Sequence, residues 1–200
     1  MVQKQKGEKP SGDDYYIFHF KPINKTPSPY VIIIPSSGGI SEAAAVTKER
    51  YAKKLQQKGF GVIILDIFYN TGITKGTISR GPLSSMGALS SIEYIKSNFP
   101  NLTNNKFGII GSSRGGMTVL SLAGELVREN YIYKNVKYWF DAGVAFYPSC
   151  GKQKLLMPVI IFIGELDNWV SSTNCKMWKN RDPEQIAVSY THLRAHETIA

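Results

Sequence analysis

The sequence is constrained most by a Gly-x-Ser-x-Gly motif, which places Ser113 between Gly111 and Gly115 directly after a short apolar run. In a sharp strand-to-helix turn the central serine takes a strained backbone conformation, and side chains two residues before and after it would collide. The apolar run at 107–110 fits a buried strand, and residues 116–127 space their apolar side chains as a helix does. This order of strand, turn and helix predicts a nucleophile elbow with Ser113 at its tip.

The motif alone is a weak signal, and two other structures are compatible with it. One is an ordinary strand-to-helix loop, and the other is a helix N-terminus that binds phosphate. A phosphate-binding loop of the Walker type has Gly-Lys followed by Ser or Thr, whereas residues 115–118 of this chain are Gly-Gly-Met-Thr. The predicted flanking strand and helix favour the elbow.

Apolar runs alternate with helical patterns along most of the chain. Predicted strands cover 15–20, 30–34, 60–65, 107–110, 142–147 and 158–163, predicted helices cover 41–58, 86–99 and 116–127, and a loop is predicted over 70–82. Ser41 is expected to cap the first helix and Gly59 to end it. Strands separated by helices indicate a single domain of three layers, with a mostly parallel sheet in the middle.

Ligands of such sheets bind at the carboxyl ends of the strands, and the candidate nucleophile Ser113 falls there. An oxyanion formed at this serine would be held by the N–H of Arg114 and by the N–H of Ser37, in the loop after the strand at 30–34. The small residues at 36–39 are also compatible with a plain turn. Because small residues let the backbone approach a ligand closely, we favour the oxyanion role for Ser37.

A serine nucleophile needs a base to accept its proton and a carboxylate to hold that base. Asp167 is the best candidate for the carboxylate, because it follows the strand at 158–163 and comes after Ser113 in the order nucleophile, acid, histidine. Glu165 is a close competitor, and Asp66, at the end of another predicted strand, is a weaker one.

The base should be a histidine beyond one more strand, and the chain has only His19, His192 and His196. His19 lies in a predicted early strand and is expected to be structural. A strand-like run at 185–190 would bring His192 or His196 to the sheet edge. Neither of them has the glycine-containing turn that usually presents such a histidine.

The composition excludes several other classes of function. The 200 residues, 42% of them hydrophobic, suffice for one core, which we assign to 14–186, with a disordered polar segment at 1–13. The net charge of +9 comes from scattered lysines and arginines without an RNA-binding aromatic signature or zinc-ligand spacing, which indicates a solvated surface and no nucleic-acid partner. No run approaches the ~20 apolar residues of a membrane helix, and the N-terminus lacks the apolar centre of a signal peptide.

Two cysteines, Cys150 and Cys175, flank the predicted strand at 158–163. A disulfide between them would favour an oxidising compartment, periplasmic or extracellular, for a protein whose export signal has been removed. Two buried free thiols in a cytoplasmic protein are the alternative, and the residues leave both open.

Together these motifs resemble the dienelactone hydrolase family of α/β-hydrolases over residues 30–181. The matching segments are 31–39, 51–55, 59–66, the elbow, and 164–169. The resemblance implies an α/β-hydrolase three-layer sandwich, Ser113 as nucleophile, Asp167 as acid, and no metal or cofactor. A subgroup of the family is similar to this chain also in having cysteines at positions matching Cys150 and Cys175.

The resemblance implies a serine hydrolase that cleaves a small carboxylic ester or lactone through an acyl-enzyme. Some family members have a cysteine nucleophile, and the serine of this chain favours ester chemistry. Two other interpretations stay open. An acyltransferase or peptidase would use the same elbow, and a non-catalytic relative would bind a ligand or protein at the same edge.

Members of the family continue beyond residue 186 with a strand, a small-residue turn, the histidine and a final helix. Residues 187–200 instead resemble translated sequencing-adaptor readthrough, so we expect a non-native tail and a sheet that is incomplete at its C-terminal edge. His192 and His196 would then be foreign, and a chain without its histidine would have weak activity or none.

Overall fold

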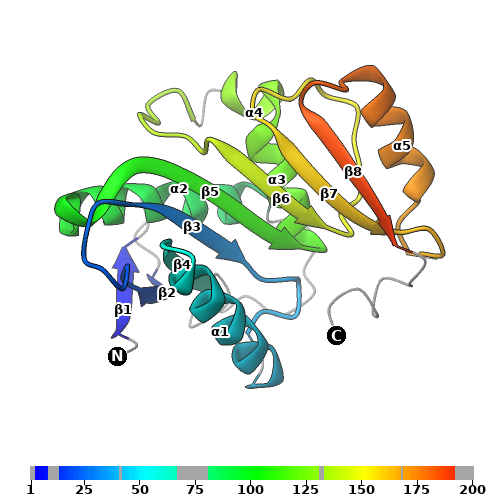
Figure 1. The fold of residues 1–200 in the computed structure, drawn as a ribbon. Coiled ribbons are helices and arrows are strands. Elements are labelled where there is room, and N and C mark those ends of the chain that lie inside the picture. The colour runs from blue at the N-terminus through cyan, green and yellow to red at the C-terminus, as the bar shows by residue number, and fades with distance from the viewer. Residues whose placement is uncertain are drawn as a thin grey trace.

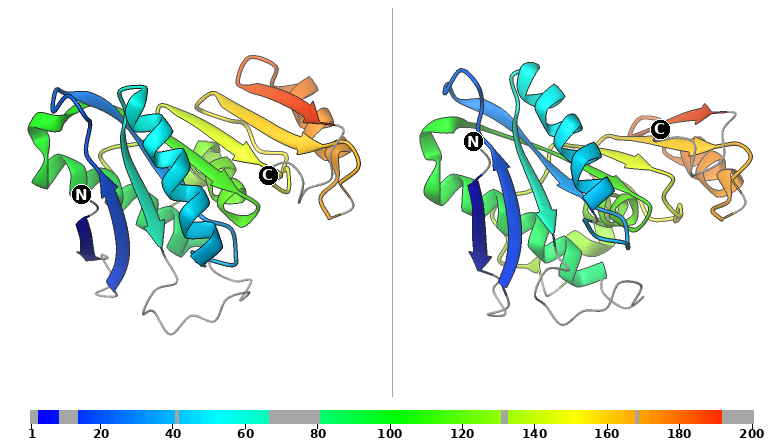
Figure 2. Two further views of the ribbon diagram at one scale, coloured as in Figure 1. Left: turned by 60° about the horizontal axis from the view of Figure 1, so that its bottom comes forward. Right: turned by 90° about the horizontal axis from the view of Figure 1, so that it is seen from below.

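The computed structural model describes residues 3–8, 14–40, 42–66, 81–130, 133–167 and 169–191. In this part of the chain one sheet of eight strands has the order β1-β2-β4-β3-β5-β6-β7-β8. The strands are β1 (Gln3–Glu8), β2 (Asp14–Phe20), β3 (Ser28–Ile34), β4 (Gly61–Asp66), β5 (Thr103–Ser112), β6 (Ala142–Phe146), β7 (Val159–Gly164) and β8 (Ile186–Thr191). β2 pairs antiparallel with both of its neighbours, β1 and β4. The remaining neighbours in the sheet, β4-β3-β5-β6-β7-β8, pair in parallel. Figure 2 places β1 and β8 at opposite edges.

Helices cover both faces of the sheet, which confirms the predicted three-layer architecture (Figure 1). The helices are α1 (Glu42–Gln57), α2 (Gly81–Asn98), the short η1 (Pro100–Leu102), α3 (Arg114–Ala123), α4 (Glu125–Arg128) and α5 (Ser172–Arg181). Ala52 of α1 belongs to a small core on one face. Ala88 of α2, Val119 of α3 and Trp178 of α5 belong to a larger core on the other face.

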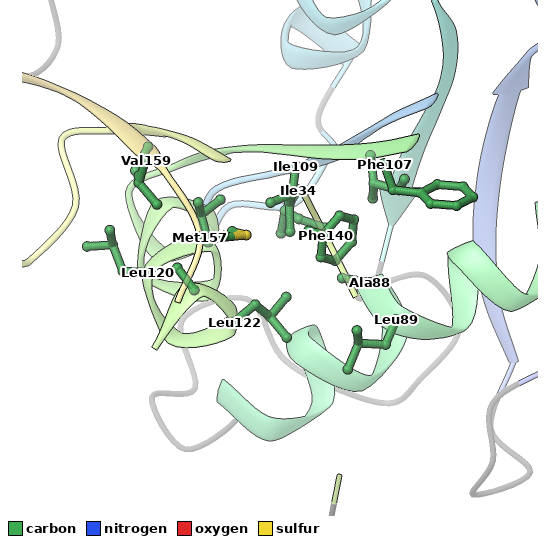
Figure 3. Close-up of a cluster of buried hydrophobic side chains, with 14 of the residues drawn as sticks. Ile34, Ala88, Leu89, Phe107, Ile109, Leu120, Leu122, Phe140, Met157 and Val159 are labelled. Atoms are coloured by element: carbon green, nitrogen blue, oxygen red, sulfur yellow. The ribbon is translucent and has the colours of Figure 1, made fainter. Parts of the chain in front are cut away.

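The strand β3 shows why the middle of the sheet is buried on both sides. Successive side chains of a strand point to opposite faces, and β3 has apolar residues at consecutive positions. Ile32 and Ile34 lie in the larger core, and Val31 and Ile33 lie in the smaller one. Figure 3 shows the larger core, where side chains of the sheet meet those of α2 and α3: Ile34, Ile109, Leu89 and Leu122. Each fully buried isoleucine stabilises the fold by about 2 kcal/mol, so β3 anchors the middle of the sheet.

The N-terminal edge of the sheet differs from the prediction. Residues Gln3–Glu8 lie in the segment expected to be disordered, but they form β1 and pair with β2. Strand pairing uses backbone hydrogen bonds, which polar residues also make, so the polar sequence was no guide here. At the other edge the strand-like run at 185–190 forms β8, whose six residues pair with β7. The alternation of Ile186, Val188 and Tyr190 with smaller residues suits such a strand.

The helix predicted over 116–127 is divided into α3 and α4 by Gly124. Gly124 has an extended conformation and forms a β-bridge with Leu155, which ends α3. A side chain at this position would overlap that of Gln153. The break therefore comes from a contact with a distant segment, which helical spacing alone does not reveal.

Other helix ends follow local rules more closely. α1 is followed by Gly59, with φ 90°, which ends the helix as predicted. α2 begins before the predicted residue 86, with Pro82 in the first turn, where a proline fits. α5 was not predicted, because its sequence contains few apolar residues. Ser41, residues 70–80 and the tail from residue 192 lie outside the described residues.

Candidate active site

Ser113 stands at the tip of the turn between β5 and α3, with backbone angles φ 54° and ψ −116°. A positive φ is costly for serine, and this is the strained conformation expected of a nucleophile elbow. A side chain at Gly111 would overlap the carbonyl group of Gly115, and one at Gly115 would overlap the carbonyl oxygens of Ile34 and Pro35. Both glycines are therefore needed for the turn to close against β3.

The end of β6 supports the turn from the other side, which the sequence did not indicate. The N–H of Ser113 donates to the carbonyl oxygen of Phe146, at 2.9 Å. Tyr147, the next residue, has a φ of 38°, and its N–H donates to the carbonyl oxygen of Phe162 in β7, at 2.7 Å. The phenol of Tyr147 is hydrogen-bonded to the side chain of Ser112, and burial raises the pKa of this phenol.

The backbone groups expected to form an oxyanion hole lie next to this turn. Arg114 is the first residue of α3, and the first N–H groups of a helix point out of its end. Ser37 lies in the turn after β3, which is closed by a 2.9 Å hydrogen bond from the N–H of Gly39 to the carbonyl oxygen of Ser36. Because the end of β3 contacts Gly115, this turn adjoins the elbow. The oxyanion role of the two N–H groups stays a prediction.

Asp167 lies three residues beyond β7, at the same end of the parallel strands as Ser113. Its Oδ1 accepts hydrogen bonds from the N–H groups of Trp169, at 2.8 Å, and Val170, at 3.1 Å. Its N–H donates to the carbonyl oxygen of Gly164, at 3.2 Å. Its Oδ2 is buried and has no hydrogen-bond partner among the described residues. A buried carboxylate oxygen without a donor is costly, so this atom is a natural acceptor for a histidine N–H.

The two competing carboxylates have different surroundings. Glu165 follows β7 directly and is exposed in a turn. Asp66 is the last residue of β4, where it pairs with Tyr16 of β2, and it is buried.

Of the three histidines, only His19 lies in the described residues. It is buried in β2, and its Nε2 is 3.1 Å from the phenol oxygen of Tyr30, near the amino end of β3 and away from the elbow. Burial, with a smaller contribution from Lys21, lowers its pKa to about 4. β8 ends at Thr191, beside Gly164 of β7, at the sheet edge that carries Asp167.

An apolar cavity of about 360 Å³ lies between α1 and the ends of β3, β5 and β6. Its lining includes Ile33, Tyr51, Ile110, Ser112 and Phe146, so one end of it borders the elbow. Within the described residues, no group of three or more His, Cys, Asp or Glu is arranged to hold a metal ion. In the same part of the chain, no helix has the length and hydropathy to cross a membrane.

A disulfide bond joins Cys150, after β6, to Cys175 in α5. The sequence left this disulfide and two free thiols open, and the structure has the disulfide. Cys175 is fully buried in the larger core.

The comparisons with known proteins agree with this architecture. The model of the dienelactone hydrolase family matches residues 16–188. Comparison with curated proteins gives no match. Among solved structures, esterase 2 of Thermogutta terrifontis is similar with a TM-score of 0.75 and 14% identity, over 96% of this chain and 82% of the esterase.

An esterase of Pyrococcus furiosus is similar with a TM-score of 0.74 and 14% identity, over 97% of this chain and 84% of that protein. Likenesses at this identity concern the fold, whereas the family match covers most of the sequence and includes the elbow and Asp167. The chain is thus a member of the dienelactone hydrolase family, with the α/β-hydrolase fold.

Proposed function

We propose that the protein is a serine esterase that cleaves small carboxylic esters or lactones through an acyl-enzyme at Ser113. The observation that carries the proposal is the strained backbone of Ser113, φ 54° and ψ −116°, at a turn that only glycines permit. Such strain persists where the surrounding structure imposes it, and it is characteristic of functional sites. The family supports ester hydrolysis as the general activity.

In the proposed reaction Ser113 Oγ attacks the carbonyl carbon of the ester and transfers its proton to a histidine. The N–H groups of Arg114 and Ser37 stabilise the oxyanion, the alcohol leaves with the proton, and water then releases the acid from Ser113. Asp167 orients the histidine through Oδ2, while Trp169 and Val170 hold Oδ1. The chemistry is complete without a cofactor.

The substrate class is proposed from the structural neighbours. Esterase 2 of Thermogutta terrifontis is described with propionate bound, with butyrate bound, and as phosphorylated by paraoxon. We extend this to short acyl esters here, because the fold is shared and Ser113 has the backbone conformation of an activated serine. An acyltransferase or peptidase would use the same groups, and assays with amide and alcohol acceptors separate these activities.

The identity of the base is tested at position 192. If His192 accepts the proton, His192→Ala lowers kcat by about 10⁴-fold or more, as loss of a triad histidine does. If 187–200 is a foreign tail, His192→Ala and His196→Ala both leave the rate unchanged. In that case the rate is low from the start, and backbone oxyanion stabilisation supplies most of it.

The decisive test of the function is hydrolysis of 4-nitrophenyl acetate and butyrate by the parent chain and by Ser113→Ala. We expect Ser113→Ala to lower the rate by about 10⁴-fold or more, leaving only the part that the oxyanion hole and substrate binding supply, and a fluorophosphonate to label the parent at Ser113. Ser112→Ala is the matched control, since it removes the neighbouring hydroxyl and should change the rate by less than about fivefold. Equal hydrolysis by parent and Ser113→Ala would disprove the proposal.

A further inference from the structure

The helix α5 lies next to β8 (Figure 1). Three contacts bind α5 and the residue that follows it to the segment after β6. Positions 175 and 178 are three residues apart, so they share a side of the helix, and Asp182 directly follows the last residue of α5. The three contacts are the disulfide between Cys175 and Cys150, the hydrogen bond from Trp178 Nε1 to the carbonyl oxygen of Gln153 at 2.8 Å, and the bond from the N–H of Leu155 to Asp182 Oδ2 at 3.1 Å.

Of the three positions in and after α5, Cys175 is nearest to the candidate acid along the chain. β7 ends at Gly164 and α5 begins at Ser172, so the loop with Asp167 spans the short interval between them. Cys175 lies in the first turn of α5 and is fully buried. The position of this first turn therefore sets the C-terminal end of the loop, including the N–H of Val170 that binds Asp167 Oδ1.

The other end of the disulfide lies close to the elbow. The carbonyl oxygen of Phe146 accepts the N–H of Ser113, and Cys150 lies four residues after Phe146 in the chain. Gly116 in the first turn of α3 packs against the same segment, because a Cβ there would lie 3.0 Å from the Phe146 oxygen and 3.3 Å from Cβ of Pro148. The segment from Phe146 to Cys150 is therefore in contact with the nucleophile turn at one end and with α5 at the other.

We infer that the Cys150–Cys175 disulfide is a positioning element for the reaction: it fixes the loop of Asp167 relative to Ser113 by joining the segment that supports the elbow to the helix that follows the acid. This inference rests on the proposed roles of Ser113 and Asp167. The structural part of the inference is that the disulfide orders the hydrogen bonds of the Asp167 loop. This part can be tested without measuring activity.

Opening the disulfide gives a direct test. A dithiol such as dithiothreitol donates two electrons and two protons: the sulfur–sulfur bond breaks, two cysteine thiols form, and the reagent closes to its own cyclic disulfide. Hydrogen exchange of the Trp169 and Val170 amides is then compared in the oxidised chain, the reduced chain and the double variant Cys150→Ser with Cys175→Ser. We expect exchange at these two amides to become at least tenfold faster in both opened forms, and amides of β3 to change by less than twofold.

The control variant is Asp182→Ala, at the far end of the same helix. It removes the acceptor of the Leu155 N–H and leaves the disulfide intact. We expect no change in exchange at Trp169 and Val170 in this variant. The inference is overturned if opening the disulfide leaves these two amides protected, or if it raises exchange in β3 by the same factor, which would indicate a general loss of stability.

Kinetics provide the second measurement. In the opened forms we expect kcat to fall about tenfold with less than a twofold change in KM, because a misoriented acid affects the transition state more than substrate binding. A twofold rise in KM with unchanged kcat would contradict the inference. If Ser113→Ala hydrolyses the ester as fast as the parent, the proposed function fails, while the exchange data still decide whether the disulfide orders the loop.

Discussion

The elbow and the acid loop reach the same edge of the sheet by different physical means. The elbow is fixed by exclusion: Gly111 and Gly115 leave no room for side chains, and carbonyl groups of β3 and β6 enclose the turn. Asp167 is fixed by attraction, through two N–H donors of its own loop and a disulfide beyond it. Where steric exclusion fixes a turn, almost no glycine of the turn can be replaced. Where hydrogen bonds and a disulfide hold a loop, losing one of them makes the loop less ordered by degrees. The two regions should therefore respond differently to the same size of chemical change.

Of the variants that compare the two regions, Asp167→Asn should have the largest effect. The variant keeps an acceptor for Trp169 and Val170, so the loop stays in place, but its amide group cannot stabilise a histidinium through the position of Oδ2. We expect kcat to fall about 10³- to 10⁴-fold, as in other triads that lose the acid in this way, with little change in the unfolding free energy. Steady-state kinetics and urea denaturation measure the two quantities.

Glu165→Gln is the matched control for this substitution. Glu165 is exposed and close to Asp167 in the chain, so its neutralisation should change kcat by less than about twofold. A large loss in Glu165→Gln, together with an active Asp167→Asn, would transfer the acid role to Glu165.

The next effect tests the exclusion that shapes the elbow. Gly115→Ala places a Cβ against the carbonyl oxygens of Ile34, the last residue of the central strand β3, and of Pro35, which follows it. These backbone atoms do not move cheaply. We expect a loss of about 3 kcal/mol in the unfolding free energy, and a loss of about 100-fold in kcat/KM from displacement of Ser113.

Gly108→Ala, on the same strand as the elbow, provides the comparison. A Cβ at Gly108 would meet its nearest atom, Cγ2 of Val31, at 3.7 Å, which is an ordinary van der Waals contact. This variant should keep its stability within about 1 kcal/mol and its full activity. Equal losses in Gly108→Ala and Gly115→Ala would show that the elbow is no more crowded than the rest of β5.

The same contrast explains what the sequence could predict. Apolar runs identified β3 to β7 because strands buried on both faces need them, and the small residues around Ser113 identified the elbow because nothing larger fits. The sequence did not predict that Phe146 and Tyr147 support the elbow. Neither a backbone acceptor nor a positive φ can be recognised from the residue types Phe-Tyr-Pro. β1 and α5 were missed because backbone pairing and a disulfide hold polar segments that have no amphipathic pattern.

A smaller effect is expected from His19, which lies away from both regions. Burial lowers its pKa to about 4 from an unfolded value near 6.5, so the folded chain binds this proton less readily than the unfolded chain. The contribution of His19 to the unfolding free energy is therefore fully present above pH 6.5. It is lost as the pH decreases from 6.5 to 4, by about 3 kcal/mol in total. Urea denaturation at pH 7.5, 6 and 5 measures this dependence.

His19→Gln removes the titrating group and should flatten that pH dependence. The buried surroundings that face the ring are Tyr30, Tyr94 and Phe99, with Lys21 as the charged neighbour. The elbow and the acid loop are not involved, so kcat of the variant at pH 7.5 should equal that of the parent. A pH dependence that persists in His19→Gln would assign it to other groups.

The smallest effect concerns Tyr147, which lies between the elbow and the disulfide. Its phenol binds the Ser112 side chain, and Tyr147→Phe removes that hydrogen bond while keeping the ring. We expect a loss of about 1 kcal/mol in the unfolding free energy and a two- to fivefold reduction in kcat, because Ser112 precedes the nucleophile in the chain.

A double-mutant cycle with Ser112→Ala isolates this hydrogen bond. If it is the link between Tyr147 and the elbow, each single variant has the same effect on kcat, and the double variant is no slower than either. Additive losses would mean that the two hydroxyls act through separate contacts, so that their hydrogen bond is not the link between Tyr147 and the elbow. The elbow would then be supported from this side by the backbone hydrogen bond between Ser113 and Phe146, and the difference between exclusion at Ser113 and attraction at Asp167 becomes sharper.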